Sequence, residues 1–435
     1  MFWCVVICGG MFAYWLSDAD QDRKNSFTVL AYMVLFAGLS IWTVRSSGLP
    51  LVRRWILASI PWLLLLSVSP FGPVELINNG NVGVVGWQWR WAPAPDERLA
   101  AVDVSPDQSL DWQTTETDYP AFLGGKYWAE VDDVAIDVES VAAQPPELLW
   151  NRRIGAGWSG FAVVGDYAIT QEQRGEEELV TCYDVDTGEL VWSHSDQARH
   201  DPGGAGALGG VGPRATPTVA AGRVFSQGAT GIINCLDARS GELLWSHDTL
   251  EEYGQTNLLW GKAGSPAIAD DLVIFAVGGD GVSVVAYRAE DGEVVWSAGD
   301  RRASYASPVV TELCGVRQVV TVDEDWVTGR RLDDGGELWE HPWPGNSDAA
   351  SSTSNPVPVG HNRLLLSKGY GVGAELIRVL RDGEDKWSVD TIWKKPVLKT
   401  KMSNVLVRDD WVFGIDDVHL SCIALEDGAK RWKKR

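Results

Sequence analysis

Cysteine and histidine are scarce and scattered in this sequence. Its 435 residues include six cysteines and six histidines, with no adjacent cysteine pair, no Cys-x-x-Cys motif and no His-Glu-x-x-His motif. Disulfide-rich domains and zinc modules need such residues at close, regular spacing, so both classes are excluded. Isolated cysteines of this kind are typical of small buried packing residues.

Positive charge is also in short supply. The chain has 37 lysines and arginines against 59 aspartates and glutamates, which gives a net charge of −22. An acidic surface repels phosphate groups, so the composition argues against a nucleic-acid partner. Tryptophan, in contrast, is abundant at 23 residues, which indicates a structural role that is repeated many times.

Long apolar runs are confined to the N-terminal part of the chain. Residues 27–44 (FTVLAYMVLFAGLSIWTV) contain no charge, and residues 55–71 (WILASIPWLLLLSVSPF) are similar. Runs of this length predict transmembrane helices. Residues 1–16 are apolar but short, and without a basic start or a cleavage site they do not resemble a signal peptide. We expect a membrane anchor of two or three helices over residues 1–71; the alternative is a set of core helices in a soluble domain.

The charges between the apolar runs predict an orientation. Residues 45–54 carry Arg45, Arg53 and Arg54 and no acidic residue. Short loops rich in arginine stay on the cytoplasmic side of a membrane. The residues after the last apolar run are therefore expected on the extracytoplasmic, periplasmic side.

Residues 72–146 have little periodicity and are predicted to form an extracytoplasmic linker. Within them Trp87, Trp89 and Trp91 alternate, so they would share one face of an extended strand. One interpretation of this face is an aromatic belt at the membrane surface. The other is a docking edge between the membrane and the outer domain. The belt is the favoured interpretation.

One sequence pattern recurs six times in the remainder of the chain. Its copies are VDTGELVW, ARSGELLW, AEDGEVVW, LDDGGELW, LRDGEDKW and LEDGAKRW, each with a glycine four residues before the final tryptophan. The tryptophans recur every 43 to 53 residues, a period that favours a propeller or a solenoid. The predicted structural residues are Trp192, Trp245, Trp296, Trp339, Trp387 and Trp432 with Gly188, Gly241, Gly292, Gly335, Gly383 and Gly428.

Local physical chemistry predicts a hairpin from this pattern. Apolar alternation precedes an Asp-x-x-Thr/Ser-Gly sequence, whose glycine can adopt the positive φ that a tight turn needs. The next strand ends on tryptophan, whose ring is large enough to wedge between neighbouring sheets. A further pair of apolar strands precedes each hairpin, as in ATPTVAAGRVFSQG from residue 215. Four strands per repeat predict an all-β fold, a propeller of four-stranded blades.

These motifs resemble a known repeat. The x-x-D-x-x-T/S-G-x-x-x-W pattern is similar to the PQQ-like propeller repeat, which occurs in quinoprotein alcohol dehydrogenases and in the non-enzymatic BamB propellers of outer-membrane β-barrel assembly. The resemblance covers residues 147–435. WQWRWAPAPDE, DYPAFLG, TQEQRG, GPRATPT and YGVG also resemble stretches of membrane-anchored bacterial PQQ-binding-like propellers. They are specific to the family but do not define an activity.

The PPELLW sequence at residues 145–150 looks like the last strand of a further blade, ending on Trp150. Its partner strands would come from the C-terminal side of a closed ring, yet only three residues follow Trp432. About six complete blades are expected here. We expect the parent ring to have seven or eight blades and the chain to be incomplete at its C-terminus.

The resemblance implies a test for cofactors. Quinoprotein dehydrogenases hold PQQ against a disulfide of adjacent cysteines, beside a Ca²⁺ ion ligated by Glu, Asn and Asp. This chain has no such pair, and Cys182, Cys235 and Cys422 each stand ten residues before their tryptophan, in separate blades. Equivalent positions in separate blades are too far apart for a disulfide. We therefore predict neither a catalytic residue nor a PQQ, calcium or other metal site.

Five cations stand just before the opening strands of the repeats: Arg214, Lys262, Arg302, Lys399 and Lys401. In propellers these strands begin near one mouth of the central channel. A ring of cations there could bind an anionic ligand or a partner segment. The alternative is that channel rims are simply polar. We call these five residues the channel-mouth cations.

The sequence therefore favours a membrane-anchored propeller without enzymatic activity, which acts as a protein-protein interaction platform in the cell envelope and resembles BamB. Two alternatives stay open. One is a PQQ-dependent quinoprotein oxidoreductase, and the other is a propeller that senses a small ligand.

Overall fold

The computed structural model forms two compact units, residues 1–93 with 203–209 and residues 94–202 with 210–435. The propeller unit, the second of these, includes part of the predicted linker. The residues described are 21–46, 48–67, 72–78, 84–94, 96–99, 102, 104, 115, 117–125, 137–144, 146–202, 210–383 and 386–434.

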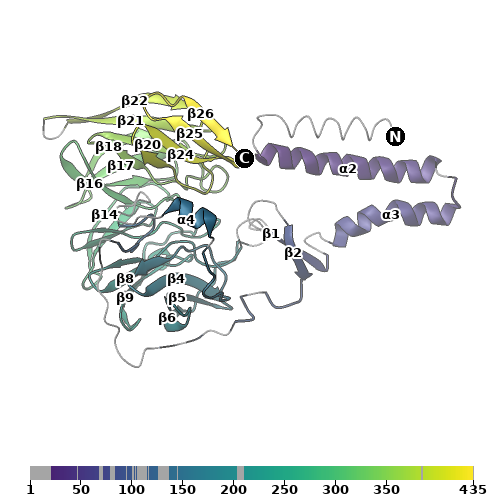
Figure 1. Ribbon diagram of the computed structural model, residues 1–435, viewed down its shortest axis with the longest axis horizontal. Coiled ribbons are helices and arrows are strands. Elements are labelled where there is room, and N and C mark those ends of the chain that lie inside the picture. The colour runs from purple at the N-terminus through teal and green to yellow at the C-terminus, as the bar shows by residue number, and fades with distance from the viewer. Residues whose placement is uncertain are drawn as a thin grey trace. The chain divides into compact units, whose positions relative to one another are not determined.

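The described residues of the first unit form two helices and a two-stranded sheet. Helices α2 (Gln21–Ser46) and α3 (Leu51–Ser67) run side by side (Figure 1). Their contact includes Ser40, whose hydroxyl donates to the Ala58 carbonyl at 3.0 Å and accepts the indole N–H of Trp62 at 3.0 Å.

The two helices form within the apolar runs, but the predicted membrane crossings find no support. In the described part of the chain, no helix is both long enough and apolar enough to cross a membrane. Helix α3 has 17 residues and contains Pro61; it rises about 25 Å, less than the roughly 30 Å of a hydrocarbon core. Helix α2 begins with the polar sequence QDRKNS. The orientation predicted from the arginines depended on these crossings, and residues 1–16 lie outside the described residues.

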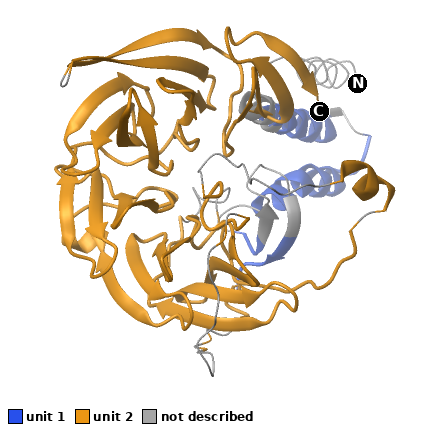
Figure 2. Ribbon diagram, turned by 60° about the vertical axis from the view of Figure 1, so that its left-hand side comes forward, with its two compact units in different colours: residues 1–93, 203–209 blue, residues 94–202, 210–435 orange. Residues whose placement is uncertain are grey.

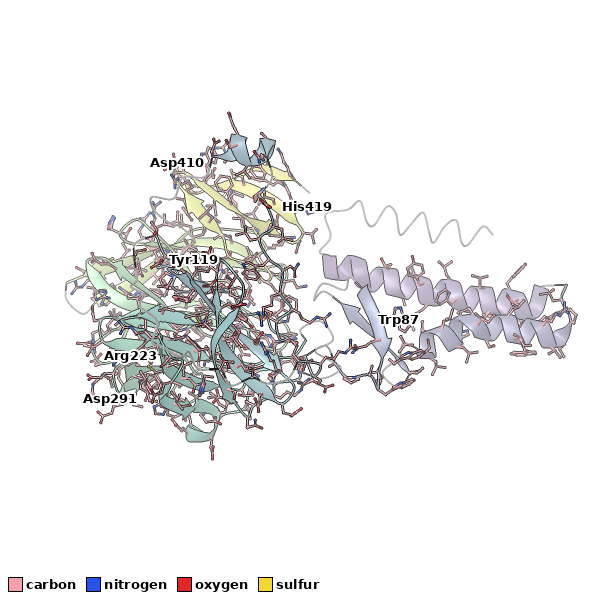
Figure 3. The ribbon with its side chains drawn as sticks, turned by 60° about the horizontal axis from the view of Figure 1, so that its bottom comes forward. Trp87, Tyr119, Arg223, Asp291, Asp410 and His419 are labelled. Atoms are coloured by element: carbon pink, nitrogen blue, oxygen red, sulfur yellow. The ribbon has the colours of Figure 1, made fainter. Side chains whose placement is uncertain are left out.

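Strands β1 (Val74–Asn78) and β2 (Val84–Trp89) pair antiparallel; Trp87 and Trp89 lie on β2, and Trp91 lies in the turn that follows it. The ring centroids of Trp87 and Trp89 are 5.7 Å apart, and those of Trp89 and Trp91 are 5.1 Å apart. The three rings therefore share one face, as the alternation predicts. All three are exposed, and Figure 3 labels Trp87 on this sheet.

The described residues of the second unit form six four-stranded antiparallel sheets, which follow one another around a common centre (Figure 2). We number these blades 1 to 6 in chain order. Blade 1 is β3 (Ala162–Val164), β4 (Tyr167–Arg174), β5 (Glu177–Asp184) and β6 (Leu190–Asp196); blade 2 is β7 (Thr218–Ala220), β8 (Arg223–Gln227), β9 (Ile232–Asp237) and β10 (Leu243–Asp248); blade 3 is β11 (Ala267–Ala269), β12 (Leu272–Ala276), β13 (Val284–Arg288) and β14 (Val294–Ala298).

The later blades repeat this order, with a longer hairpin in blade 5. Two short helices, α4 (Val138–Ala143) and α5 (Thr249–Glu252), complete the described elements. Blade 4 is β15 (Val309–Leu313), β16 (Val316–Val322), β17 (Trp326–Arg331) and β18 (Glu337–Pro342); blade 5 is β19 (Val357–Val359), β20 (Arg363–Lys368), β21 (Gly373–Asp382) and β22 (Lys386–Lys395); blade 6 is β23 (Leu406–Arg408), β24 (Trp411–Asp416), β25 (His419–Ala424) and β26 (Lys430–Lys434).

The turn between the third and fourth strands shows why the repeat sequence is a hairpin. In blade 1 the Asp184 carboxylate accepts the backbone N–H and the hydroxyl of Thr187, both at 2.8 Å. Gly188 then donates its N–H to the Asp184 carbonyl and has a φ of +69°. The glycine of every repeat has a positive φ, which residues with a Cβ rarely adopt.

The hydrophobic core lies between the blades. Five clusters of buried side chains join successive blades, and each contains a tryptophan from the outer strand of the earlier blade. In the first cluster Trp192 is fully buried among residues of blades 1 and 2, including Val219 and Leu236. The ring thus wedges between neighbouring sheets and removes a large apolar area from water.

Candidate functional site

A β-bulge precedes the tryptophan that lies between the blades. In blade 1 Trp192 pairs with Cys182 and Leu190 pairs with Tyr183, which leaves Val191 as the extra residue. Such a bulge raises the local twist and re-aims the side chain that follows. We call the tryptophan that follows the bulge in each blade the seam tryptophan of that blade. These tryptophans pair as Trp192–Cys182, Trp245–Cys235, Trp296–Ala286, Trp339–Gly329, Trp393–Leu376 and Trp432–Cys422.

Two contacts join a seam tryptophan to the next blade. The indole N–H of Trp192 donates to the Ala238 carbonyl of blade 2 at 3.1 Å. Its ring lies against Gly241, where an added Cβ would be 2.6 Å from the ring. The same donation recurs in Trp150 to Val185, Trp245 to Ala289, Trp296 to Leu332 and Trp393 to Leu425. Trp150 therefore occupies a seam position ahead of blade 1.

The alignment on Trp387 needs correction, because Trp393 is the seam tryptophan of blade 5. The hairpin of β21 and β22 is longer than in the other blades, and Trp387 stands near its tip, opposite Arg381. The Arg381 guanidinium lies 5.4 Å from the Trp387 ring. Gly383 lies at the same tip, and it does not contact a seam tryptophan as Gly241 does among the described residues. A single spacing rule could not reveal this insertion.

The tryptophans of blades 4 and 6 differ from the regular seams. Trp339 is buried but donates its indole N–H to the Gln318 side chain of its own blade at 2.6 Å. Trp432 lies on the outer strand of blade 6. Together with Trp411, Phe413, Cys422 and Arg431 it lines a shallow pocket of about 260 Å³.

A second set of contacts links the inner strands. The backbone N–H that opens one blade donates to a side-chain oxygen at the same position in the next blade. The chain of donors and acceptors is Gly160 to Thr216, Thr216 to Ser265, Ser265 to Ser307, Ser307 to Asn355 and Asn355 to Asn404, over 2.7–3.1 Å. We call this series of hydrogen bonds the inner belt. The inner belt and the tryptophan seams join each blade to its neighbour at two distances from the centre, so the blades form a rigid scaffold.

Three of the channel-mouth cations lie near one another, around Tyr305. Burial raises the pKa of Tyr305 to about 12, and the nearby Arg302 and Arg214 oppose this rise. Lys262 is only 3% exposed and donates to the Val277 carbonyl. Burial, with a smaller effect of Arg302, lowers the pKa of Lys262 to about 8. Burial likewise lowers the pKa of Arg214 to about 10, and its guanidinium donates to the carbonyls of Gly210 and Gly212.

Carboxylates accompany several of these cations, so the group is not an uncompensated positive ring. Arg302 bonds to Glu324 at 3.2 Å and to Asp348 at 3.0 Å. Lys399 bonds to Asp417 at 2.7 Å. Lys401 stacks its ammonium 5.1 Å from the Tyr370 ring. These partners of Lys399 and Lys401 belong to blades 6 and 5.

The described residues do not bring together the cysteine pair that the resemblance to quinoproteins implies. Cys182, Cys235 and Cys422 are free thiols on separate blades, each opposite a seam tryptophan. Burial raises the pKa of all three thiols. In the described part of the chain, no group of three His, Cys, Asp or Glu side chains could hold a metal ion.

Sequence reasoning missed one functional feature: residues of the predicted linker pair with the sheet edges of the propeller. On the outer strand β6, Ser193 donates its N–H to the Val104 carbonyl at 2.9 Å. The Ser193 hydroxyl accepts the Val104 N–H at 3.2 Å and donates to the Val102 carbonyl. Nearby, Arg199 bonds at 2.6 Å to Asp96, which is almost fully buried.

The inner edges of blades 1 and 2 hold a second segment. Tyr119 exchanges two backbone hydrogen bonds of 2.8 Å with Val163 of β3, and the Pro120 carbonyl accepts the N–H of Val219 on β7 at 2.7 Å. Ala121 is 2% exposed, and Figure 3 labels Tyr119 beside the blades. The DYPAFLG sequence resembles a family motif, and nothing in its composition indicates that it pairs with a strand.

Blades of four antiparallel strands, joined by tryptophan seams at a recurring Gly-x-x-x-Trp motif, define a β-propeller of the PQQ-like repeat class. A family model described as "Outer membrane protein assembly factor BamB" matches residues 176–434, more than half of the chain. The chain belongs to this family.

Individual relatives are more distant. An outer membrane protein assembly factor BamB of Shewanella oneidensis is 30% identical over 131 residues, which cover 29% of this chain and 32% of that protein. The match thus spans about a third of the relative's length.

Among solved structures, a europium-containing methanol dehydrogenase covers 73% of this chain and 78% of its own, at 13% identity and a TM-score of 0.53. The BamB of Moraxella catarrhalis covers 64% of this chain and 70% of its own, at 16% identity and a TM-score of 0.40. At these identities the dehydrogenase likeness shows the fold alone.

Proposed function

We propose that this chain is a non-enzymatic propeller that binds protein partners in the cell envelope. The observation that carries the proposal is that the sheet edges of the propeller unit already hold extended segments. Ser193 of β6 binds Val102 and Val104, and β3 and β7 bind Tyr119 and Pro120. Pairing of an extended segment with a sheet edge is a recurrent mode of peptide recognition.

The rigidity of the scaffold supports this function. The seam tryptophans and the inner belt fix the relative positions of the blades, so exposed sheet edges are presented without reorganisation. A pre-organised surface loses less conformational entropy on binding. Binding at blade edges needs no cofactor and leaves the fold unchanged.

The envelope location rests on the family. Both the family model and the Shewanella relative are described as outer membrane protein assembly factors. We carry over only the coarser part of that description, a partner protein in the envelope.

The channel-mouth cations are proposed as a second contact region, of mixed charge. Arg302 is the most accessible of the three cations around Tyr305, with 38% of its side chain exposed, and it is held between Glu324 and Asp348. A partner segment would meet alternating charges there. Such a contact favours orientation and association rate more than affinity.

Site-specific photo-cross-linking of the full chain in the cells that make it tests the platform. The cross-linker replaces Ser246 on an outer edge, Arg302 near the channel, or Trp411 on blade 6; exposed Asp390 on β22 is the control. We expect one or a few defined partner proteins from at least one of the first three positions and none from the control. Equal, unspecific capture from all four positions would contradict the platform.

The quinoprotein alternative has its own readout. The purified full chain is mixed with PQQ and Ca²⁺, and quinone absorbance and dye reduction are followed. We expect neither signal above that of free PQQ. Bound-quinone absorbance together with turnover of an alcohol would replace the platform by an oxidoreductase.

A further inference from the structure

Three blades share the residues that hold the extended segment on blade 1. Trp192 is followed by Ser193, Trp245 by Ser246 and Trp296 by Ser297. The register is also shared, because Ser193 pairs with Thr181, Ser246 with Asn234 and Ser297 with Val285, each one step beyond the seam tryptophan. The N–H of each serine therefore points to the same side, the outer edge of its blade.

The three serines differ in whether a segment covers them, and the uncovered Ser246 donates its hydroxyl to the Ile233 carbonyl of its own blade at 3.1 Å. Ser193 is 5% exposed beneath Val102 and Val104. Ser246 and Ser297 are both exposed. In the part of the chain that the structure describes, no segment pairs with the outer edge of β10 or β14.

The apolar residues before the tryptophans are likewise less exposed in blade 1 than in blades 2 and 3. In blade 1 Leu190 and Val191 are half-buried. Leu243 and Leu244 of blade 2 are 44% and 45% exposed, and Val294 and Val295 of blade 3 are 49% and 42% exposed. An uncovered edge with exposed leucine and valine attracts another strand.

Blades 4 to 6 have a charge at the serine position. It is occupied by Glu340, Lys394 and Lys433, all exposed. Charged side chains on edge strands prevent pairing with further strands. Blades 2 and 3 therefore have outer edges without a protecting charge, and these edges carry the same serine that binds the extended segment in blade 1.

We infer that the outer edges of β10 and β14 bind an extended segment of a partner protein, with β-branched residues at alternate positions like Val102 and Val104. The partner strand donates an N–H to the hydroxyl of Ser246 or Ser297 and accepts the N–H of the same serine through a carbonyl. Its β-branched side chains cover Leu243 and Leu244, or Val294 and Val295. This inference rests on the proposed function and locates its binding surface.

A peptide of residues 98–107 of this chain (RLAAVDVSPD) is the probe, added in fluorescent form to the purified full chain. On blade 1 the tethered segment outcompetes it through its high effective concentration, so added peptide reports on blades 2 and 3. We expect saturable binding, measured by anisotropy. A peptide with Val104→Pro lacks the N–H that the serine hydroxyl accepts, and it should not bind.

The variants assign the binding to the two edges. Loss of both hydroxyls in Ser246→Ala/Ser297→Ala should weaken binding about tenfold. Ser246→Lys/Ser297→Lys copies the charged edges of blades 5 and 6 and should abolish binding. Ser388→Lys, at an exposed serine on β22, is the matched control and should bind like the wild type. Circular dichroism and thermal unfolding verify that each variant is folded, and Leu243→Glu/Val294→Glu is a second, independent disruption of the same edges.

Unchanged peptide binding by a folded Ser246→Lys/Ser297→Lys protein would overturn the inference. So would a dimer, detected by sedimentation, that the same variant dissociates, because a second copy would then occupy the edges. If cross-links form only from Arg302 or Trp411, the platform function stands and the edge inference fails. If no position captures a partner while the peptide still binds these edges, the edge chemistry stands and the platform function fails.

Discussion

Blades 1 and 2 have nearly the same outer strand, LVWSHSD in β6 and LLWSHD in β10, but their surroundings differ. In blade 1 the serine after the tryptophan binds a segment from the N-terminal side of the propeller; in blade 2 the equivalent serine is exposed. The tryptophan in front of it performs the same task in both blades. One short motif thus combines an internal function, the seam, with an external one, the edge.

The largest effect should come from replacing the seam tryptophans of blades 1 and 2. Trp192→Ala and Trp245→Ala should each lower the free energy of unfolding by about 3–5 kcal/mol, because a large buried ring and its indole hydrogen bond are lost. The two losses should agree closely in denaturant unfolding. Trp432→Ala, on the outer strand of blade 6, should cost clearly less. A small effect at Trp192 alone would mean that the seams of blades 1 and 2 are not equivalent.

The second prediction compares the covered outer edge of blade 1 with the exposed outer edge of blade 2. Ser193→Lys should lower the free energy of unfolding by about 2–3 kcal/mol, because it removes the two hydrogen bonds of the hydroxyl and forces a charge under Val102 and Val104. Ser246→Lys should lower it by no more than about 1 kcal/mol, because only the hydrogen bond from its hydroxyl to the Ile233 carbonyl is lost. Limited proteolysis should also cut the Ser193→Lys protein near residues 94–104. Equal stability of the two variants would contradict the difference between the edges.

The third prediction concerns the joint between the two blades. Glu178 of β5 accepts the N–H of Ala229 of blade 2, and burial raises the pKa of its carboxyl from 4.5 to about 7. The folded state therefore binds this proton more tightly than the unfolded chain. Stability from this group is fully present below about pH 4.5 and is lost as the pH rises through about 7. Glu178→Gln should remove that loss, on the order of 2 kcal/mol, in unfolding experiments at both ends of this range.

Glu375 provides the matched control. It is equally buried, but hydrogen bonds from His341, Lys394 and Thr391 outweigh the effect of burial and lower its pKa to about 2. Its contribution is present above about pH 4.5 and is lost only as the pH falls toward 2. Glu375→Gln should therefore remove a loss of stability below about pH 4.5, whereas Glu178→Gln removes one above it. An identical pH profile for the Glu178→Gln and wild-type proteins would contradict the assignment.

The sequence predicts those features of the fold that depend on residues close together in the chain. A turn that needs a positive φ requires Gly188 and its counterparts, and the spacing to Trp192 follows from the strand length. The bulge at Val191 depends on which residues pair across the ladder, which spacing alone does not determine. The regular spacing points to Trp387 instead of Trp393 because it does not account for the longer hairpin of blade 5.

The edge contacts were beyond sequence reasoning for a different reason. Val102 and Val104 lie in a stretch without periodicity, and their partner Ser193 is about 90 residues away. Nothing local distinguishes Ser193 from Ser246. The apolar runs predict the helices α2 and α3, but no helix in the described part of the chain is both long enough and apolar enough for a membrane span.

Hydrogen exchange of the isolated full chain tests the difference between the edges most directly. The backbone amide of Ser193 is bonded to Val104, while those of Ser246 and Ser297 face the outer edges of their sheets. We predict slow exchange at Ser193 and fast exchange at Ser246 and Ser297, with the latter two slowed when the peptide of residues 98–107 is added. Equal protection of all three amides without peptide would contradict the account.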